Sequence, residues 1–179
     1  MKRNKSPLTT KAAFLDRENV INRDEKGYLY KIKDFKWLAG VRKVIKILKD
    51  NGYLVIVISN QSGIGRGYYS YKDLKKLNKF INKELSKNKT KIDDFFHCPH
   101  HPDYGLGKYK KICNCRKPKN GMIIKAKKKW KISLKKSFMI GDKFSDKIAA
   151  KKSNIKFFYK KKIRFDIQIK KILKKIKTS

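Results

Sequence analysis

The sequence predicts an α/β protein with a central parallel sheet. Residues 12–15, 53–58 and 138–141 are short apolar runs, and each is followed by polar or acidic residues. Runs that are apolar at every position are typical of parallel strands buried on both faces. A segment with helical spacing separates the first two runs, which gives the strand–helix–strand order of a right-handed crossover.

The composition is that of a single folded domain. The chain has 179 residues, of which 40% are hydrophobic and 12% aromatic, so it can bury one core and is not disordered. A formal net charge of +36 would ordinarily suggest nucleic acid or an anionic membrane as partner. However, 43 of the 50 basic residues are Lys, spread along the chain among many Ile and Asn, as an A/T-rich genome would encode. Because Arg is the preferred residue for nucleic-acid recognition, we expect nonspecific attraction to polyanions and no specific nucleic-acid partner.

Two further features indicate the cytoplasm. Residues 1–11 are basic and polar, without the apolar run of a signal peptide, and no later stretch approaches a membrane span. The three Cys all fall within residues 98–115, which argues against a disulfide framework and for metal binding in a reducing compartment. We therefore expect a cytoplasmic monomer with no membrane span.

The first half of the chain completes the crossover. Residues 22–39 lack periodicity and predict an irregular excursion over the end of the first strand. A helix opens at Gly40 and ends at Asn51-Gly52, with Val41, Val44, Ile45 and Leu48 on its apolar face. The β-branched run 53–58 is the strongest strand signal in the sequence and is expected at the centre of the sheet.

The second half supplies the remaining elements. The patterns predict a helix over 71–86, a strand over 93–97, a helix from Pro118 or Lys119 to Trp130, a helix around 148–150 and a strand over 155–159. An apolar stripe lies among lysines at the C-terminus and consists of Ile169, Ile172, Leu173 and Ile176. We favour docking of this helix on the domain over a basic amphipathic helix at the surface.

Polar side chains follow three of the predicted strands, where open α/β sheets place their ligands. Asp16 and Glu18 follow the first strand; such a pair can bind Mg²⁺, or act as nucleophile and proton shuttle. Residues 59–67 bring hydroxyls, amides, three glycines and an arginine to the second strand end, as in an oxyanion cradle. Asp142 would complete the cation site that Asp16 begins, and Asp146 lies one turn further on.

A second metal site is predicted in the segment that holds the cysteines. Cys98, His100, Cys113 and Cys115 match the Cys₃His set of a tetrahedral zinc site, which with four protein ligands would be structural. His101 could replace His100, whereas His97 is expected to be an ordinary strand-end residue. The alternative is three unligated thiols beside a chance histidine; a disulfide between Cys113 and Cys115 would be strained.

Taken in order, these stretches resemble the haloacid dehalogenase-like phosphatases, which are Rossmann-like α/β enzymes. The four matching motifs are Asp16-x-Glu18, Ser59, Lys117, and Gly141-Asp142 with Asp146. The longer stretches 14–17, 59–64, 98–102, 113–118 and 141–143 resemble the histidinol-phosphate and heptose-bisphosphate phosphatase subfamily, and the heptose enzymes most. The resemblance covers about residues 11–160. It implies a three-layer sandwich over residues 1–160 with a zinc-stapled loop at 98–115, followed by a basic helix or tail at 161–179.

The resemblance also implies an activity, a substrate and roles for individual residues. The activity is Mg²⁺-dependent hydrolysis of the 7-phosphate of a heptose 1,7-bisphosphate, for the core sugars of lipopolysaccharide. Asp16 would be the nucleophile that forms an aspartyl-phosphate, Glu18 the general acid/base, and Ser59 and Lys117 the stabilisers of the transferring phosphoryl group. Asp16, the backbone carbonyl of Glu18 and Asp142 would bind Mg²⁺. The substrate would be positioned by Asn60, Gln61, Ser62, Arg116, Lys143, Asp24, Gly27 and Tyr28.

One departure from the family pattern concerns the acid. The family normally has Asp-x-Asp-Gly-Thr, whereas this chain has Asp16-Arg17-Glu18-Asn19-Val20. The extra methylene of Glu18 moves the acid by roughly 1.5 Å, and the turn loses its permissive glycine. The sequence is therefore compatible with a fully active phosphatase, with one of low turnover, or with one that has lost its activity.

Three other functions are alternatives to a heptose-bisphosphate phosphatase. Histidinol-phosphate phosphatases share the zinc loop but typically have Asn-Gln-Asp-Gly after the second strand, where this chain has residues 60–63 as Asn-Gln-Ser-Gly. Residues 60–67 also resemble the corresponding segment of polynucleotide 3′-phosphatases, and with the charge of +36 this keeps a DNA-end enzyme as an alternative. Those enzymes, however, lack the zinc loop. A catalytically degenerate, polyanion-binding protein of the same fold would show salt-sensitive binding and no Mg²⁺-dependent turnover.

Overall fold

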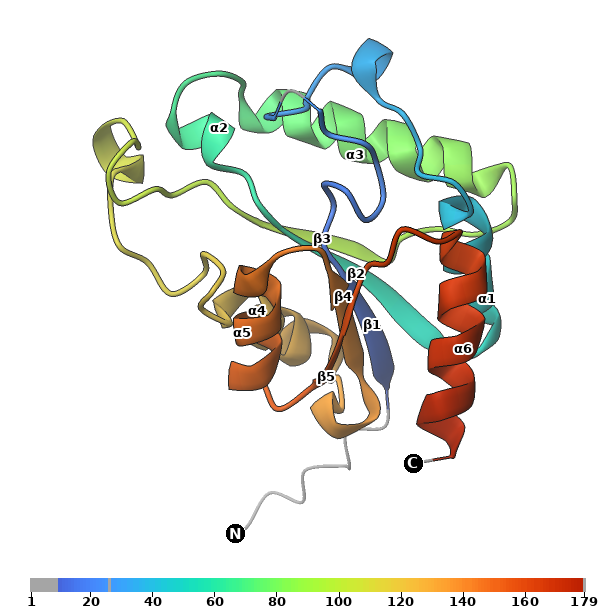
Figure 1. Ribbon diagram of the computed structural model, residues 1–179. Coiled ribbons are helices and arrows are strands. Elements are labelled where there is room, and N and C mark those ends of the chain that lie inside the picture. Colours follow the sequence, from blue (N-terminus) through green and yellow to red (C-terminus); the bar gives the residue numbers. More distant parts are fainter. Residues whose placement is uncertain (1–9, 26, 179) are drawn as a thin grey trace, which may run out of the picture.

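The structure is a computed structural model, which describes residues 10–25 and 27–178. Its centre is a five-stranded parallel sheet in the order β3-β2-β1-β4-β5 (Figure 1). The strands are β1 (Lys11–Leu15), β2 (Tyr53–Asn60), β3 (Asp94–Cys98), β4 (Phe138–Gly141) and β5 (Lys156–Tyr159). All five predicted strands are therefore present. The run 53–58 forms an internal strand, as expected, but the central position belongs to β1.

Helices cover both faces of the sheet, as the prediction of a three-layer sandwich requires. On one face lie α1 (Val41–Asp50), α3 (Tyr71–Ser86) and α6 (Phe165–Lys177), and on the other α4 (Gly121–Trp130) and α5 (Phe144–Lys152). Because side chains alternate along a strand, Ala13 and Leu15 of β1 join the first core and Ala12 and Phe14 the second. The short elements are α2 (Ser62–Gly65) and three 3₁₀ turns at Ile32–Asp34, Gly107–Tyr109 and Leu134–Lys136.

The start of α4 differs from the prediction. The helix begins at Gly121 and not at Pro118 or Lys119. The backbone of Lys117 explains the delay, because its N–H donates to Asn60 Oδ1 and its carbonyl accepts from Asn60 Nδ2, both at 3.0 Å. A tight turn follows, in which the Lys119 amide donates to the Arg116 carbonyl at 2.8 Å. The backbone groups that would open a helix here instead fix Lys117 beside β2.

The excursion over the first strand end has the irregular structure that the sequence predicts. Apart from the 3₁₀ turn at Ile32–Asp34, its described residues form no helix or named strand before α1. It lies above the end of β1 (Figure 1). Val20 and Ile21, which directly precede it, are fully buried in the first core and anchor its start.

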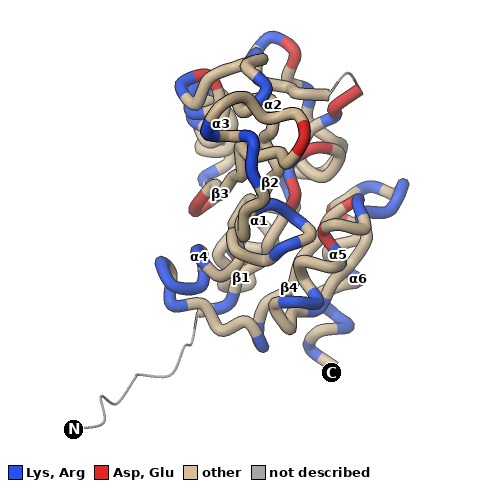
Figure 2. The backbone as a smooth tube through the Cα atoms, turned by 90° about the vertical axis from the view of Figure 1, so that its left-hand side faces the viewer, with Lys and Arg blue, Asp and Glu red and all other residues tan. Residues whose placement is uncertain are grey.

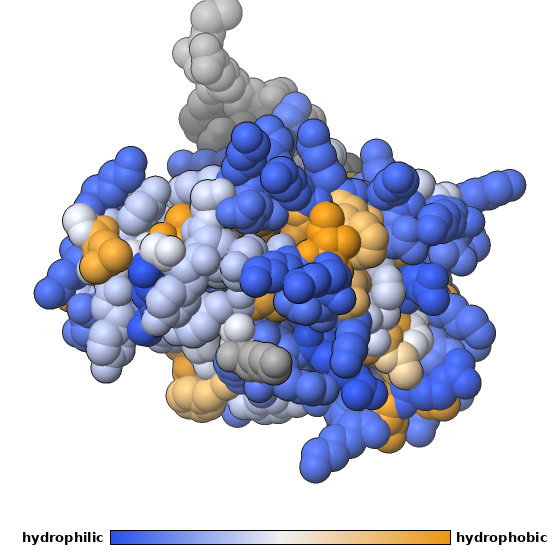
Figure 3. Space-filling model, turned by 90° about the horizontal axis from the view of Figure 1, so that it is seen from above, coloured by the Kyte–Doolittle hydropathy of each residue, from blue (hydrophilic) through white to orange (hydrophobic). Residues whose placement is uncertain are grey.

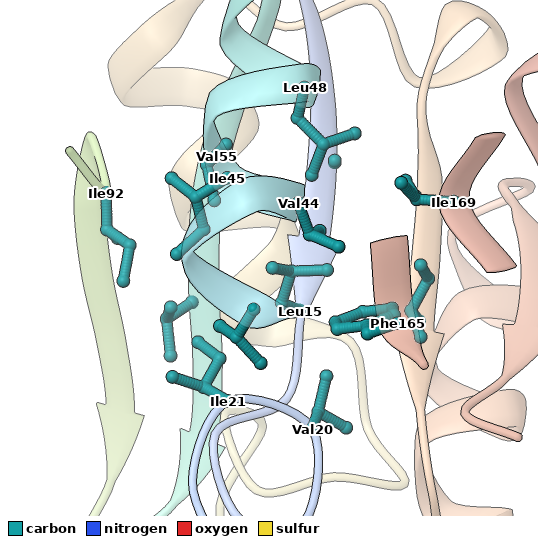
Figure 4. Close-up of a cluster of buried hydrophobic side chains, with 14 of the residues drawn as sticks. Leu15, Val20, Ile21, Val44, Ile45, Leu48, Val55, Ile92, Phe165 and Ile169 are labelled. Atoms are coloured by element: carbon teal, nitrogen blue, oxygen red, sulfur yellow. The ribbon is translucent and has the colours of Figure 1, made fainter. Parts of the chain in front are cut away.

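The C-terminal helix docks on the domain. Phe165, Ile169, Ile172 and Leu173 are buried in the same core cluster as the apolar face of α1. Figure 4 shows Phe165 and Ile169 beside Val44 and Leu15. The lysines of α6 occupy its other face, so the predicted stripe is a packing surface.

In the view of Figure 2, basic residues are spread along the backbone from one end of the molecule to the other. The face seen in Figure 3 is mostly hydrophilic, with small, separate hydrophobic patches. Among the described residues, no helix combines the length and the apolar character needed to cross a membrane.

Candidate active site

The predicted catalytic residues meet where the central strands end. Asp16 follows β1, Ser59 lies near the end of β2, and Asp142 follows β4. Because β1 lies between β2 and β4 in a parallel sheet, these ends share one edge. Lys117 reaches the same edge from the loop before α4.

Lys117 is a buried cation that contacts the predicted nucleophile. Its ammonium lies 2.7 Å from Asp16 Oδ1 and 2.7 Å from Asp146 Oδ1, and it donates to the Ile58 carbonyl at 3.0 Å. Burial alone would lower the pKa of Lys117, but the charges of Asp16 and Asp146 raise it above its ordinary value. The lysine is therefore charged and fixed against the predicted nucleophile.

Burial raises the pKa of Asp16 to about 7, and the negative charges of Asp146 and Glu18 act in the same direction, while Lys117 opposes them. The Asp16 residue as a whole is 3% exposed. A second cation near this group would favour its ionised form.

Three carboxylates at this edge could hold such a cation. Oxygen atoms of Asp16, Asp142 and Asp146 lie within 4.8 Å of one another. Asp142 Oδ1 is buried and has no hydrogen-bond partner among residues 10–25 and 27–178. A buried, unpartnered carboxylate oxygen is suited to bind a metal ion. Asp146 is engaged elsewhere: one oxygen pairs with Lys117, and the other accepts the Lys143 amide at 3.0 Å, which caps α5. The residues thus fit a hard cation bound by Asp16 and Asp142.

Gly141 allows this arrangement because a side chain there would collide with Asp146. A Cβ atom on Gly141 would overlap Asp146 Oδ2 and lie 2.5 Å from Asp146 Cβ. The glycine between β4 and Asp142 is therefore needed for the close approach of the two segments.

The Glu18 carboxylate lies in a cradle of donors. It accepts from Gln61 Nε2 at 2.7 Å, from Ser59 Oγ at 2.8 Å and from Arg17 Nε at 2.8 Å. Burial alone would raise the pKa of Glu18, but the Arg17 charge and the hydrogen bonds from Gln61 and Ser59 lower it below the ordinary value. The carboxylate is ionised at neutral pH in this arrangement.

The turn after Glu18 keeps a conformation that favours glycine. Asn19 has φ +56°, and Asn is the residue besides glycine that best tolerates the left-handed region. Its side chain accepts the Asp24 amide at 3.2 Å. The missing glycine is thus replaced without losing the turn.

Sequence reasoning missed two residues that fix this cradle. Arg17 is 1% exposed, pairs with Glu18 and donates to the Leu29 carbonyl at 2.7 Å, which links the cradle to the excursion. Tyr69 donates from its hydroxyl to Gln61 Oε1 at 2.5 Å. Nothing in the periodicity of either segment marks these roles, because both depend on contacts across loops.

A cavity of about 460 Å³ opens beside the cradle, a size within the usual range for small-ligand sites. All eight residues predicted to position the substrate line it: Asn60, Gln61, Ser62, Arg116, Lys143, Asp24, Gly27 and Tyr28. Glu18 and Lys117 also reach it. Arg66, Tyr69 and Ser145 were not singled out by the sequence, although Arg66 lies in the glycine-rich stretch 59–67.

The four predicted zinc ligands also lie together. Sulfur atoms of Cys98, Cys113 and Cys115 are 3.1–3.5 Å apart, and His100 Nδ1 lies 3.4 Å from Cys115 Sγ and 3.6 Å from Cys98 Sγ. These separations far exceed a disulfide bond of about 2.05 Å and are close to the roughly 3.8 Å between thiolates bound to one zinc.

His101 and His97 lie outside this cluster. His101 Nδ1 instead accepts the amides of Asp103 and Tyr104, both at 3.2 Å. The His97 ring lies 5.3 Å from the ring of Tyr71. Of the three histidines, His100 is the one that the structure places with the three cysteines.

Comparison with known proteins shows which protein family the chain belongs to. A family model described as polynucleotide kinase 3 phosphatase matches residues 12–177. D-glycero-alpha-D-manno-heptose-1,7-bisphosphate 7-phosphatase of Photorhabdus laumondii is 45% identical over 145 residues, which cover 81% of this chain and 79% of that protein. The corresponding beta enzyme of Haemophilus ducreyi is 42% identical over 147 residues, covering 82% and 80%.

A solved structure agrees with these relatives. The D,D-heptose 1,7-bisphosphate phosphatase of B. bronchiseptica, in complex with magnesium and phosphate, superposes with a TM-score of 0.73 at 27% identity, covering 83% of this chain and 78% of that chain. The chain belongs to the haloacid dehalogenase-like phosphatases, in the subfamily that contains the D-glycero-D-manno-heptose-1,7-bisphosphate 7-phosphatases.

Proposed function

We propose that the protein is a magnesium-dependent phosphatase that removes the 7-phosphate of D-glycero-D-manno-heptose 1,7-bisphosphate, for lipopolysaccharide core heptose synthesis in the cytoplasm. The observation that carries the proposal is the contact of Lys117 with Asp16 at 2.7 Å, because Lys117 also lines the cavity that holds all eight predicted substrate residues. The activity of the relatives supports the same substrate.

The proposed reaction has two steps. In the first, an Asp16 oxygen attacks phosphorus, the bond to the sugar oxygen breaks, and Glu18 gives that oxygen a proton. In the second, Glu18 takes a proton from water as the water oxygen attacks the aspartyl-phosphate, which releases phosphate and restores Asp16. Lys117 and the Ser59 hydroxyl stabilise the charge on the phosphoryl oxygens.

Glu18 must gain a proton before it can act as an acid. Its pKa lies below the ordinary value in the arrangement described, so the resting carboxylate is charged. A phosphoryl dianion that enters beside Glu18 and shares Ser59 would favour the protonated form. Substrate binding would thereby prepare the acid.

Asp16, Asp142 and the backbone carbonyl of Glu18 are the proposed Mg²⁺ ligands. The unpartnered Asp142 Oδ1 and the mutual distances of the carboxylates support this assignment. Bound Mg²⁺ would supply Lewis-acid stabilisation of the phosphoryl oxygens. Cys98, His100, Cys113 and Cys115 would bind a structural zinc, because four protein ligands leave no open coordination position.

The test is phosphate release, with and without Mg²⁺, from a heptose 1,7-bisphosphate, histidinol phosphate and a 3′-phosphorylated oligonucleotide. We expect Mg²⁺-dependent turnover of the first substrate and its loss in Asp16→Asn. Preferential turnover of the oligonucleotide would instead favour a DNA-end phosphatase, the function suggested by the description of the family model. No turnover by folded protein would contradict the proposed activity.

A further inference from the structure

Arg66 occupies a position that the proposed roles do not explain. It follows α2 directly, its amide donates to the Ser62 carbonyl at 2.9 Å, and its side chain lines the cavity beside Arg116 and Lys143. No carboxylate in the described part of the chain forms an ion pair with it. Its Nε atom is buried and has no hydrogen-bond partner among the residues that the structure describes.

Two aromatic rings hold this guanidinium. Its central carbon lies 4.4 Å from the centroid of Tyr104 and 5.5 Å from that of Tyr28. Tyr28 is in turn supported edge-on by Tyr68, at 4.8 Å between centroids. Cation–π contacts with rings do not use the N–H groups as hydrogen-bond donors, so those groups remain available for a bidentate anion.

The loop of residues 98–115 carries one of these rings, which also lies 4.9 Å from the His101 ring between centroids. Tyr104 and Leu106 are two residues apart and lie between the two ligand pairs. The Leu106 amide donates at 2.7 Å to the carbonyl of Gly65, the residue directly before Arg66. A Cβ atom on Gly65 would overlap the Pro99 carbonyl, so the loop and α2 are in close contact. The loop thus positions a cavity residue as well as supporting the fold.

The charges that line the cavity divide into two groups. Lys117 is neutralised by Asp16 and Asp146, and Glu18 by Arg17. Arg66, Arg116 and Lys143 remain, opposed among the lining residues only by Asp24. A second anion, distinct from the phosphoryl group transferred to Asp16, would find uncompensated positive charge there.

We propose that Arg66 is a specificity residue that binds the second phosphate of a sugar bisphosphate while the first lies at Asp16. This inference rests on the proposed function. An arginine that contacts two rings suits a phosphate dianion, because its guanidinium can form bidentate N–H···O bonds with phosphate oxygens. Arg66 would therefore contribute to the preference for a bisphosphate over a monophosphate.

The experiment compares Arg66→Gln with Arg42→Gln, a control at an exposed position of α1. We expect Arg66→Gln to lower the ratio of kcat/KM for heptose 1,7-bisphosphate to that for heptose 7-phosphate by about tenfold or more, chiefly through KM. Tyr104→Leu should lower the ratio in the same direction but less. Arg42→Gln should leave the ratio unchanged.

An unchanged ratio in Arg66→Gln would overturn the inference, as would equal losses on both substrates. Binding of the bisphosphate to Asp16→Asn, measured by calorimetry with and without Arg66→Gln, makes the same comparison without turnover. If the wild type hydrolyses neither substrate, the proposed function fails, while the binding comparison still decides the role of Arg66: weaker bisphosphate binding supports it and equal binding refutes it.

Discussion

At the scale of single residues, the altered first motif is compatible with a working site. Asn19 adopts the left-handed conformation at φ +56°, and the longer Glu18 side chain reaches Ser59 and Gln61. The sequence shows that Asn19 replaces the glycine of the family pattern. It cannot show that Asn19 adopts the left-handed conformation of that turn, because this depends on the local fold. Nor can it show where the extra methylene directs the carboxylate.

Tyr69 fixes the orientation of Gln61 and, through it, of Glu18. Removing the hydroxyl in Tyr69→Phe leaves Gln61 Oε1 without its donor, so the amide can turn away from Glu18. The loss of one hydrogen bond is worth about 1 kcal/mol, and we expect kcat to fall several-fold. Because the Gln61 bond helps to lower the pKa of Glu18, the alkaline limb of the kcat–pH profile should move to higher pH.

The matched control is Tyr159→Phe, because Tyr159 is 43% exposed on β5 and does not line the cavity. It should leave both kcat and the pH profile unchanged. If Tyr69→Phe altered the melting temperature but neither kcat nor the profile, Tyr69 would have a structural role only.

At the scale of elements, the loop from Cys98 to Cys115 contains the four predicted zinc ligands and also adjoins residues of the candidate active site. It ends directly before Arg116 and Lys117, and it carries Tyr104. With zinc bound to all four ligands, metal removal would free the segment that holds the buried lysine against Asp16.

We therefore expect Cys115→Ser, or treatment with a strong chelator, to lower both thermal stability and kcat. Metal analysis should find about one zinc per chain in the wild type and less in the variant. Ser86→Ala provides a control at an exposed helix end. A wild-type sample that is active and folded without zinc would contradict the assignment.

The strand ends could be predicted from the sequence more readily than the start of α4. Apolar runs followed by carboxylates indicate both a buried strand and the edge where it ends, so the sequence predicts that Asp16 and Asp142 lie together. The position of Pro118 suggested a helix start, but the Asn60 side chain binds both backbone groups of Lys117. That contact spans 57 residues, and no local pattern reports it.

At the scale of the whole molecule, the core extends to the C-terminal helix. Ile169 is fully buried, whereas Ile167 on the same helix is 45% exposed. From the sequence alone, the apolar stripe of α6 fits either packing into this core or a basic amphipathic helix at the surface. The helix packs into the core because α1 presents an apolar face to it.

Two matched substitutions test this packing. Ile169→Ala should lower the free energy of unfolding by about 2–4 kcal/mol, because it removes buried methylene groups and leaves a cavity. Ile167→Ala should change it by less than about 1 kcal/mol. Denaturant unfolding measures both, and equal effects would show that α6 does not contribute to the core as described.

The most direct test of the proposed mechanism is the rate of Mg²⁺-dependent phosphate release from heptose 1,7-bisphosphate by wild type and Glu18→Gln. Glutamine keeps the size of the side chain but cannot transfer the proton. We predict a loss in kcat of about 10²–10⁴-fold, with the fold unchanged by circular dichroism. Turnover by Glu18→Gln at the wild-type rate would show that Glu18 is not the acid.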